Sequence, residues 1–264
     1  MNILQEIAER TKERIETQKK IISLEKIMEA VSSETQSGFP FEKALRSDDV
    51  SFICEIKKAS PSKGIIAQEF PYLDIARDYE AAGAAAISVL TEPFWFKGSD
   101  YYLREIANTV KIPLLRKDFT VDSYMIYEAK LLGASAVLLI CSILDQDTLI
   151  EYIKIAFNLG LSALVEVHNE KEISMALFAG AKIIGVNNRN LKTFEVDITL
   201  SERLRKLVPP EVIFVSESGI DSPDDIVKLR EIGADAALIG ESFMRSADRK
   251  AEINRLRGYG NGKS

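Results

Sequence analysis

Short apolar runs alternate with amphipathic stretches from about residue 50 to about residue 250 of the 264-residue chain. The stretches carry apolar residues at three- and four-residue spacing, which predicts helices. Strands and helices that alternate with short loops indicate parallel strands joined by right-handed crossovers. Eight such units predict a (β/α)₈ barrel, an α/β fold. The predicted strands are SFICEI (51–56), AAISVL (85–90), IPLLRK (112–117), SAVLLI (135–140), SALVEV (162–167), KIIGVN (182–187), VIFVSE (212–217) and DAALIG (235–240).

Glycine marks the ends of several predicted helices, because it readily adopts the left-handed conformation that terminates a helix. These glycines are Gly83, Gly133, Gly160, Gly180 and Gly233. At the other end of a helix, Ser222 and Pro223 form a typical start.

An open doubly wound sheet is the alternative fold. No G-x-G-x-x-G follows the first strand and no run resembles an odd edge strand, which favours the barrel.

Composition excludes several classes of function. The net charge of −6 is spread over 34 basic and 40 acidic residues, which gives no electrostatic case for nucleic acid. Apolar runs such as AVLLICSIL are too short to span a bilayer, and the charged N-terminus lacks a signal-peptide core. Cys54 and Cys141 are expected to be reduced core residues of a cytoplasmic protein.

The chain has a single histidine, His168, so a zinc site is not expected. Acid–base chemistry must then fall largely to Glu, Asp, Lys or Tyr side chains. His168 follows LVEV and is interpreted as a residue at a strand end with a satisfied hydrogen bond.

Three parts are expected: a helical extension over residues 1–48, a catalytic barrel over 49–257 and a flexible tail over 258–264. The extension has a sparse apolar stripe made of Leu4, Ile7, Ile15 and Ile22 among many charges. Such helices would pack on the barrel. Whether they form a solvated arm or a lid is open from the sequence.

The first predicted strand has an unusual inner face. Side chains two apart in a strand point to the same side. If Phe52, Cys54 and Ile56 pack outward against helices, Glu55 and Lys57 point into the mouth of the barrel. In this fold the active site is built from the C-terminal ends of the strands.

The same parity places ionisable or polar residues at the ends of other strands: Lys117, Glu166, Asn187, Arg189 and Glu217. A purely structural ion-pair network is the alternative, and it is less consistent with the whole set than with any single residue. Desolvation would lower the pKa of Lys117 and neighbouring glutamates would raise it, so the sequence leaves the direction open.

Two further groups of residues suggest the two ends of a ligand. The loops SESGI and IGESF follow the last two strands, the usual phosphate site of this fold, where Gly219 and Gly240 allow close approach of backbone N–H groups. Glu241 would have to face the phosphate with its backbone N–H rather than with its side chain. The aromatic loop TEPFWF and Phe119 indicate that part of the ligand is flat and apolar. Phe94 and Trp95 are equally consistent with packing of the loop onto the barrel.

Together these features resemble the indole-3-glycerol phosphate synthase family of tryptophan biosynthesis. The resemblance runs from ILQEI to GESFMR. The motifs that carry it are EIKKASPSKG (55–64), SVLTEPFWFKGS (88–99), LLRKDF (114–119), LVEVHNEKE (164–172), GAKIIGVNNRNLKTFEVD (180–197), SESGI (216–220) and LIGESFMR (238–245).

The resemblance implies a (β/α)₈ barrel whose N-terminal helical extension helps to cover the site, with no metal and no organic cofactor. The implied partner is a small phosphosugar–anthranilate molecule, 1-(2-carboxyphenylamino)-1-deoxyribulose 5-phosphate. The implied reaction, that of a carboxy-lyase, closes the indole ring with loss of CO₂ and water. No nucleic acid, membrane or fused isomerase domain is implied. A monomer is expected, and association with other enzymes of the pathway stays open.

The resemblance also implies roles. Lys117 is similar to the general acid of ring closure, and Glu166 to the group that handles protons in the dehydration. Lys57 is similar to a lysine that contacts substrate oxygens, and whether Lys57 or Glu166 is the acid of dehydration stays open. The remaining implied residues are Glu55, Asn187 and Glu217 for the catalytic network, Arg189, Ser218, Phe96, Phe119 and Leu138 for the substrate, and Ser60, Gly219, Gly240 and Glu241 for the phosphate.

Two other functions stay open. One is another phosphosugar isomerase or lyase on the same barrel, for which a Cys/Asp acid–base pair at the mouth would be expected. The other is a non-catalytic barrel that binds a phosphorylated ligand. Such a protein would need the glycine loops but would tolerate loss of Lys117 or Glu166.

Overall fold

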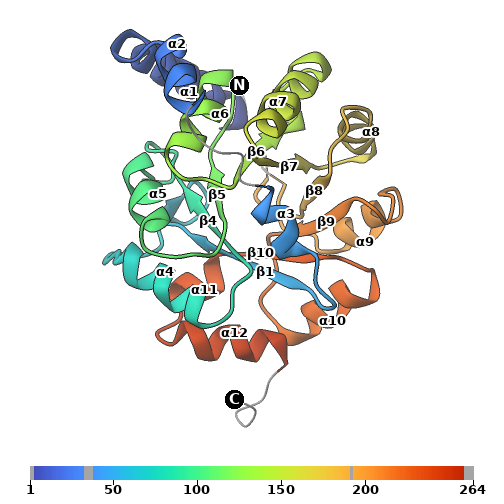
Figure 1. The fold of residues 1–264 in the computed structure, drawn as a ribbon. Coiled ribbons are helices and arrows are strands. Elements are labelled where there is room, and N and C mark those ends of the chain that lie inside the picture. Colours follow the sequence, from blue (N-terminus) through green and yellow to red (C-terminus); the bar gives the residue numbers. More distant parts are fainter. Residues whose placement is uncertain (1–2, 33–37, 191–192, 259–264) are drawn as a thin grey trace.

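A computed structural model describes residues 3–32, 38–190 and 193–258 (Figure 1). Eight parallel strands close into a barrel in the order β1-β10-β9-β8-β7-β6-β5-β4, with β4 returning to β1. The predicted (β/α)₈ fold is therefore confirmed. The strands are β1 (Ser51–Ile56), β4 (Ala86–Leu90), β5 (Leu114–Lys117), β6 (Ala136–Ile140), β7 (Ser162–Val167), β8 (Ile183–Asn187), β9 (Ile213–Glu217) and β10 (Ala236–Ile239).

Helices surround the ring of strands, as Figure 1 shows. Two short strands, β2 (Ala59–Ser60) and β3 (Gly64–Ile65), pair antiparallel in the loop after β1. The helices outside the barrel are α4 (Tyr72–Ala81), α5 (Asp100–Ala107), α6 (Ser123–Leu131), α7 (Gln146–Asn158), α8 (Glu170–Phe178), α9 (Thr199–Arg205), α10 (Pro223–Glu231), α11 (Glu241–Arg245) and α12 (Arg249–Arg257), with a short 3₁₀ helix η1 (Cys141–Ile143) after β6.

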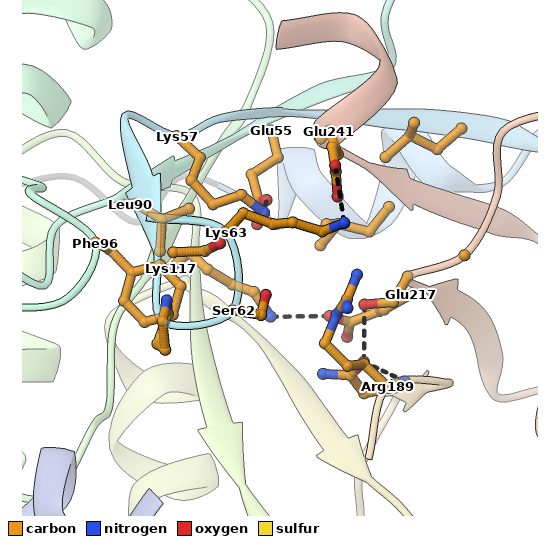
Figure 2. Close-up of a pocket in the computed structure, with 18 of the residues that line it drawn as sticks. Glu55, Lys57, Ser62, Lys63, Leu90, Phe96, Lys117, Arg189, Glu217 and Glu241 are labelled. Atoms are coloured by element: carbon orange, nitrogen blue, oxygen red, sulfur yellow. Dashed lines mark hydrogen bonds and ion pairs between the residues drawn. The ribbon is translucent and has the colours of Figure 1, made fainter. Parts of the chain in front are cut away.

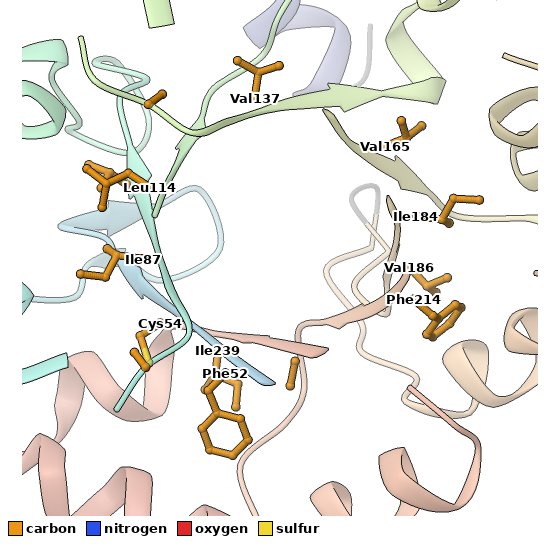
Figure 3. Packing of buried hydrophobic residues seen from close by; sticks show 14 of the residues in the cluster. Phe52, Cys54, Ile87, Leu114, Val137, Val165, Ile184, Val186, Phe214 and Ile239 are labelled. Atoms are coloured by element: carbon orange, nitrogen blue, oxygen red, sulfur yellow. The ribbon is translucent and has the colours of Figure 1, made fainter. Parts of the chain in front are cut away.

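Two apolar clusters follow from the alternation of side chains along the strands. The outer cluster lies between strands and helices and contains Phe52, Cys54 and Ile56. Figure 3 shows members of this cluster directed away from the ring of strands. Ile53, on the opposite face of β1, belongs to the cluster that fills the barrel. The predicted orientation of β1 is therefore confirmed.

The expected caps are present. The glycines that follow five of the helices have positive φ: Gly83, Gly133, Gly160, Gly180 and Gly233. Ser222 caps α10 in a capping box, with Pro223 at the first helical position. Asn169 caps α8 by accepting a hydrogen bond from the backbone N–H of Glu172. These local signals end each helix where the next strand must begin.

The N-terminal part contains α1 (Ile3–Ile21), α2 (Leu24–Ser32) and α3 (Pro40–Leu45). Leu4, Ile7 and Ile15 of the predicted apolar stripe are buried on α1. Ile22 was predicted wrongly: it lies just beyond the end of α1 and is 47% exposed. The stripe ends early because the helix itself stops at Ile21.

Helix α3 has a different place from α1. It contacts the strands β1 and β4, and in the view of Figure 1 it lies across the ring of strands. Its side chains Phe41 and Leu45 are fully buried and join Ile53 and Ala86 in the inner cluster. Since Ala86 begins β4, α3 covers the end of the barrel where the strands start.

Within residues 3–32, 38–190 and 193–258, no helix is long and apolar enough to cross a membrane. Helix α12 ends at Arg257 and is capped by Gly258, which has φ 82°. The flexible tail predicted for 258–264 lies outside the described residues from 259 onward.

Candidate active site

One cavity of about 690 Å³ gathers the side chains and glycines that the sequence assigned to the site. It lies at the C-terminal ends of the strands, and Figure 2 shows side chains of several strands directed into it. The predicted residues that line it are Glu55, Lys57, Ser60, Phe96, Lys117, Phe119, Leu138, Glu166, Asn187, Arg189, Glu217, Ser218, Gly219, Gly240 and Glu241.

Lys117 lies between two glutamates in the centre of this cavity. Its Nζ is 3.0 Å from Glu166 Oε2 and 2.8 Å from Glu217 Oε2. The three residues come from the ends of β5, β7 and β9, and all three side chains are nearly buried. An ammonium in such a place is tolerated only because it is paired.

The network sets the protonation of its members. Burial acts to lower the pKa of Lys117, but the charges of Glu217, Glu166 and Glu55 together raise it well above its usual value. Burial also raises the pKa of Glu217, to about 7, against the effect of Lys117. Burial would raise the pKa of Glu166 too, yet Lys117 and His168 outweigh it and that pKa is lowered. At neutral pH the site therefore contains a charged lysine, a charged Glu166 and a partly protonated Glu217.

A second ion pair comes from β1, where Lys57 Nζ donates to Glu55 Oε2. Two glycines leave space for carboxylates of the network, Gly240 for Glu55 and Gly185 for Glu217. A Cβ on Gly240 would collide with the Glu55 carboxylate, and a Cβ on Gly185 would collide with that of Glu217. Gly240 therefore makes room for Glu55, a role that the sequence did not reveal.

Asn187 connects the two sides of the mouth. Its Oδ1 accepts hydrogen bonds from Ser218 Oγ at 2.9 Å and from the Arg189 backbone N–H at 3.1 Å. Arg189 lines the cavity and its Nη1 donates to the carbonyl of Phe194. Ser218 and Gly219 follow β9 with φ of 71° and 78°. A non-glycine residue in this conformation is strained, as is common at functional sites.

The aromatic end of the cavity is formed by Phe96 and Phe119, whose ring centroids are 6.2 Å apart, together with Leu138. The loop that carries Phe96 is organised by Glu92, a fully buried carboxylate. Its two oxygens accept the backbone N–H groups of Phe94, Trp95 and Phe96 at 2.7–2.9 Å. Glu92 was not predicted from the sequence, because nothing local distinguishes a carboxylate that binds the backbone of its own loop.

The opposite end carries the predicted phosphate loops. Ser60, Gly219, Gly240 and Glu241 line it. The Glu241 carboxylate is 3.7 Å from Lys63 Nζ and 3.2 Å from Arg245 Nε. Two cations and a carboxylate therefore meet where the sequence predicted an anion.

Comparison with known proteins decides the family. A sequence model described as indole-3-glycerol phosphate synthase matches residues 4–256. A protein of that name from Ruminiclostridium cellulolyticum is 62% identical over 257 residues, which cover 97% of this chain and 99% of the relative. One from Lachnoclostridium phytofermentans is 50% identical, with 97% and 98% covered. The chain belongs to the indole-3-glycerol phosphate synthase family.

Solved structures more distant than this family share the fold alone. A 3-hexulose-6-phosphate synthase gives a TM-score of 0.62 at 16% identity and covers 80% of this chain and 99% of its own. Thiamine phosphate pyrophosphorylase from Pyrococcus furiosus gives 0.60 at 16% identity, with 83% and 96% covered. At such identity the likeness supports the barrel and says nothing about substrate.

Several residues of this synthase-family site were not predicted as site residues. Leu4 and Ile7 of α1 line the cavity, and Arg14 of the same helix is 2.8 Å from the buried Asp118 carboxylate, next to Lys117. Helix α1 therefore packs over the mouth. The apolar stripe was the available signal, but sequence periodicity does not say which surface a helix covers.

His168 was interpreted as a strand-end residue with a satisfied hydrogen bond, and only one of its two ring nitrogens has such a bond. Nδ1 is 3.3 Å from Glu172 Oε2. Nε2 is buried without a hydrogen-bond partner in the described part of the chain, and it lies 3.5 Å from Glu166 Oε1. The imidazole is thus beside the site rather than apart from it.

Both cysteines are free and buried in the outer cluster. Burial raises the pKa of the Cys141 thiol to about 12 and also raises that of Cys54. Neither lines the cavity. Among the described residues, no three His, Cys, Asp or Glu side chains are grouped so that they could bind a metal ion.

Proposed function

We propose that this chain catalyses the reaction of its family, closing the indole ring of 1-(2-carboxyphenylamino)-1-deoxyribulose 5-phosphate with loss of CO₂ and water. The observation that carries the proposal is the place of Lys117. It lies between Glu166 and Glu217, with apolar rings on one side of the cavity and the glycine loops on the other. A substrate with an aromatic acid at one end and a phosphate at the other matches this polarity.

Binding uses the two ends. Phe96, Phe119 and Leu138 receive the anthranilate ring, and Arg189 is a suitable partner for its carboxylate, since a guanidinium forms paired hydrogen bonds with carboxylates. Ser60, the backbone of Gly219 and Gly240, and the start of α11 at Glu241 receive the phosphate. Lys63 and Arg245 add positive charge there.

Ring closure needs an acid at the ketone. The ring carbon that bears the carboxylate attacks the carbonyl carbon, and Lys117 gives a proton to the oxygen as negative charge develops on it. The raised pKa of Lys117 means that it is protonated before the reaction. A weak acid can serve because the forming alkoxide is far more basic than the ketone. Loss of CO₂ then returns the electron pair to the ring.

Dehydration needs an acid and a base. The new hydroxyl leaves as water after it gains a proton, and the neighbouring CH₂ loses one. Glu166, with its lowered pKa, is ionised and suits the base. Lys57 is one candidate for the acid. Glu166 is the other, provided that it has first taken up a proton, in which case another group must be the base. Glu55, Asn187 and Glu217 position this network and the hydroxyl groups of the substrate.

Indole fluorescence tests the proposal directly. Incubation with the anthranilate–ribulose phosphate should produce the indole signal, and Lys117→Met and Glu166→Gln should suppress it. A barrel that binds the substrate without any turnover would be a binding protein. Turnover of phosphoribosyl-anthranilate in its place would indicate an isomerase, which the outward position of both cysteines disfavours.

Three finer points remain predictions from the sequence and the family: a monomeric state, a place in the cytoplasm, and a small molecule as the main partner. Sedimentation of the purified chain would test the first, and localisation of a tagged chain in cells the second.

A further inference from the structure

The imidazole of His168 lies between two carboxylates. Nε2 is 3.5 Å from Glu166 Oε1, and Nδ1 is 3.3 Å from Glu172 Oε2. His168 directly follows β7, the strand that carries Glu166. A residue at i+2 of a strand end lies on the same side of the sheet as residue i. The ring therefore reaches the site from behind Glu166.

Glu172 is itself fixed. Its Oε2 accepts the backbone N–H of His168 at 2.8 Å, and its Oε1 accepts Asn169 Nδ2 at 2.8 Å. Asn169 is the N-cap of α8, and Glu172 lies in the first turn of that helix. The imidazole thus has an anchor on a helix, and its orientation is determined by the start of α8.

A third carboxylate also acts on the ring. Glu217 acts on it from β9, and the Cys141 thiol lies next to the carbonyl of Glu172 at 3.8 Å. Burial acts to lower the pKa of His168, but the hydrogen bond that the ring donates to Glu172 and the charges of Glu166, Glu172 and Glu217 raise it above its usual value. Lys117 pairs with Glu166 Oε2, whereas His168 faces Oε1 of the same carboxylate.

We propose that His168 is a positioning residue for Glu166, which it holds from behind as an imidazolium anchored on Glu172. Lys117 is within hydrogen-bond distance of Oε2 of that carboxylate, and His168 faces Oε1. When His168 is protonated, the two cations bracket the carboxylate and favour its ionised form. This inference rests on the proposed function insofar as Glu166 handles a proton, while the pairing itself is a property of the free protein.

The first experiment needs no substrate. Because the chain has one histidine, the imidazole signals in an NMR titration of the whole protein belong to His168. We expect its pKa to lie above the usual 6.5 and to fall in Glu166→Gln. Glu170→Gln is the matched control, since Glu170 is an exposed carboxylate in the same turn of α8. A pKa that does not move in Glu166→Gln overturns the proposal.

The second experiment uses kcat to separate the effect of the His168 charge from the effect of its hydrogen-bond donor. His168→Ala removes the cation, so the pKa of Glu166 rises and the acid limb of the kcat–pH profile moves to higher pH by roughly one unit or more. His168→Gln keeps a donor without the charge, so the plateau kcat should recover while the acid limb stays shifted. KM should change little, because His168 does not line the cavity.

A merely structural histidine would give a different result: lower thermal stability with an unshifted kcat profile in the folded variants, which overturns the proposal. Absence of indole formation by the unaltered protein would instead refute the proposed function. In that case the NMR titration still decides whether His168 and Glu166 are coupled.

Discussion

Lys117 Nζ and Glu217 Oε2 lie 2.8 Å apart, although their residues are separated by 100 positions in the sequence. The pairing has opposite consequences for the two groups. It keeps Lys117 charged, whereas Glu217 still has a raised pKa because burial and Glu166 outweigh the lysine. At neutral pH Lys117 is therefore protonated and Glu217 is partly protonated.

The first prediction is that Lys117 acts by giving up a proton rather than by its charge alone. Arginine keeps the charge but does not deprotonate at working pH. Lys117→Arg and Lys117→Met should both lower kcat by roughly two to four orders of magnitude. The Kd of a substrate analogue should change far less, since the phosphate and aromatic contacts remain. The control is Lys154→Arg, on the exposed side of α7. A near-normal kcat in Lys117→Arg would contradict the prediction and direct the search for the acid to Lys57.

The second prediction concerns stability and pH. The pKa of Glu217 rises from 4.5 to about 7 on folding, so between these values the native state binds more protons than the unfolded state. Its contribution to the free energy of unfolding therefore falls as pH rises through this window. Lys117 does not titrate there, because its pKa is raised well above that range.

Glu217→Gln removes this dependence while leaving an amide oxygen for Lys117. Urea unfolding at pH 5 and at pH 7.5 should show that the variant gains stability relative to the unaltered protein as pH rises. Glu217 also helps to raise the pKa of His168, so the variant lowers that pKa. His168 then loses less stabilisation as pH rises, which acts in the same direction as the expected gain. Parallel pH dependence in the two would contradict the raised pKa.

The sequence alone was sufficient for the barrel and for the orientation of its strands. Both depend on local patterns: the alternation that separates Phe52 from Ile53, and glycines such as Gly133 that end helices. The position of a polar residue at a strand end, such as Glu166, is equally local. A barrel brings such ends together whatever the loops do.

The pairings and protonation states could not be obtained in this way. Whether Lys117 meets Glu166, Glu217 or both depends on the stagger between strands, which no single segment encodes. The role of Gly240 depends on a carboxylate 185 positions earlier in the chain, Glu55. The division of the extension into α1 over the mouth and α3 over the other end is likewise a tertiary property.

The third prediction is that α1 contributes to substrate binding. Ile7 and Ile15 are both buried on this helix, each 1% exposed, but only Ile7 lines the cavity. Ile15 packs against Tyr124 and Met125 of α6. Either change to Ala should cost roughly 2–5 kcal/mol of stability, whereas only Ile7→Ala should raise KM for the substrate.

Steady-state kinetics on the two folded variants, beside their melting temperatures, make this comparison. Equal KM values would show that α1 supports the barrel without acting as a lid. Deletion of residues 1–48 is a poorer test, because it also removes Phe41 and Leu45 from the inner cluster.

The last prediction concerns the phosphate end, where Gly240→Val would disturb Glu55 and is therefore unsuitable. Glu241 pairs with Lys63 and Arg245, so a bound phosphate must compete with this carboxylate for the same cations. Glu241→Gln should bind inorganic phosphate and substrate more tightly, by about five-fold, since removing one like charge nearby is worth about 1 kcal/mol in a water-exposed place. Calorimetry with phosphate measures the change. Glu202→Gln is the control, because Glu202 of α9 forms a similar i,i+4 pair with Lys206. Weaker phosphate binding in Glu241→Gln would contradict the prediction and show that the carboxylate is needed to hold the loop in place.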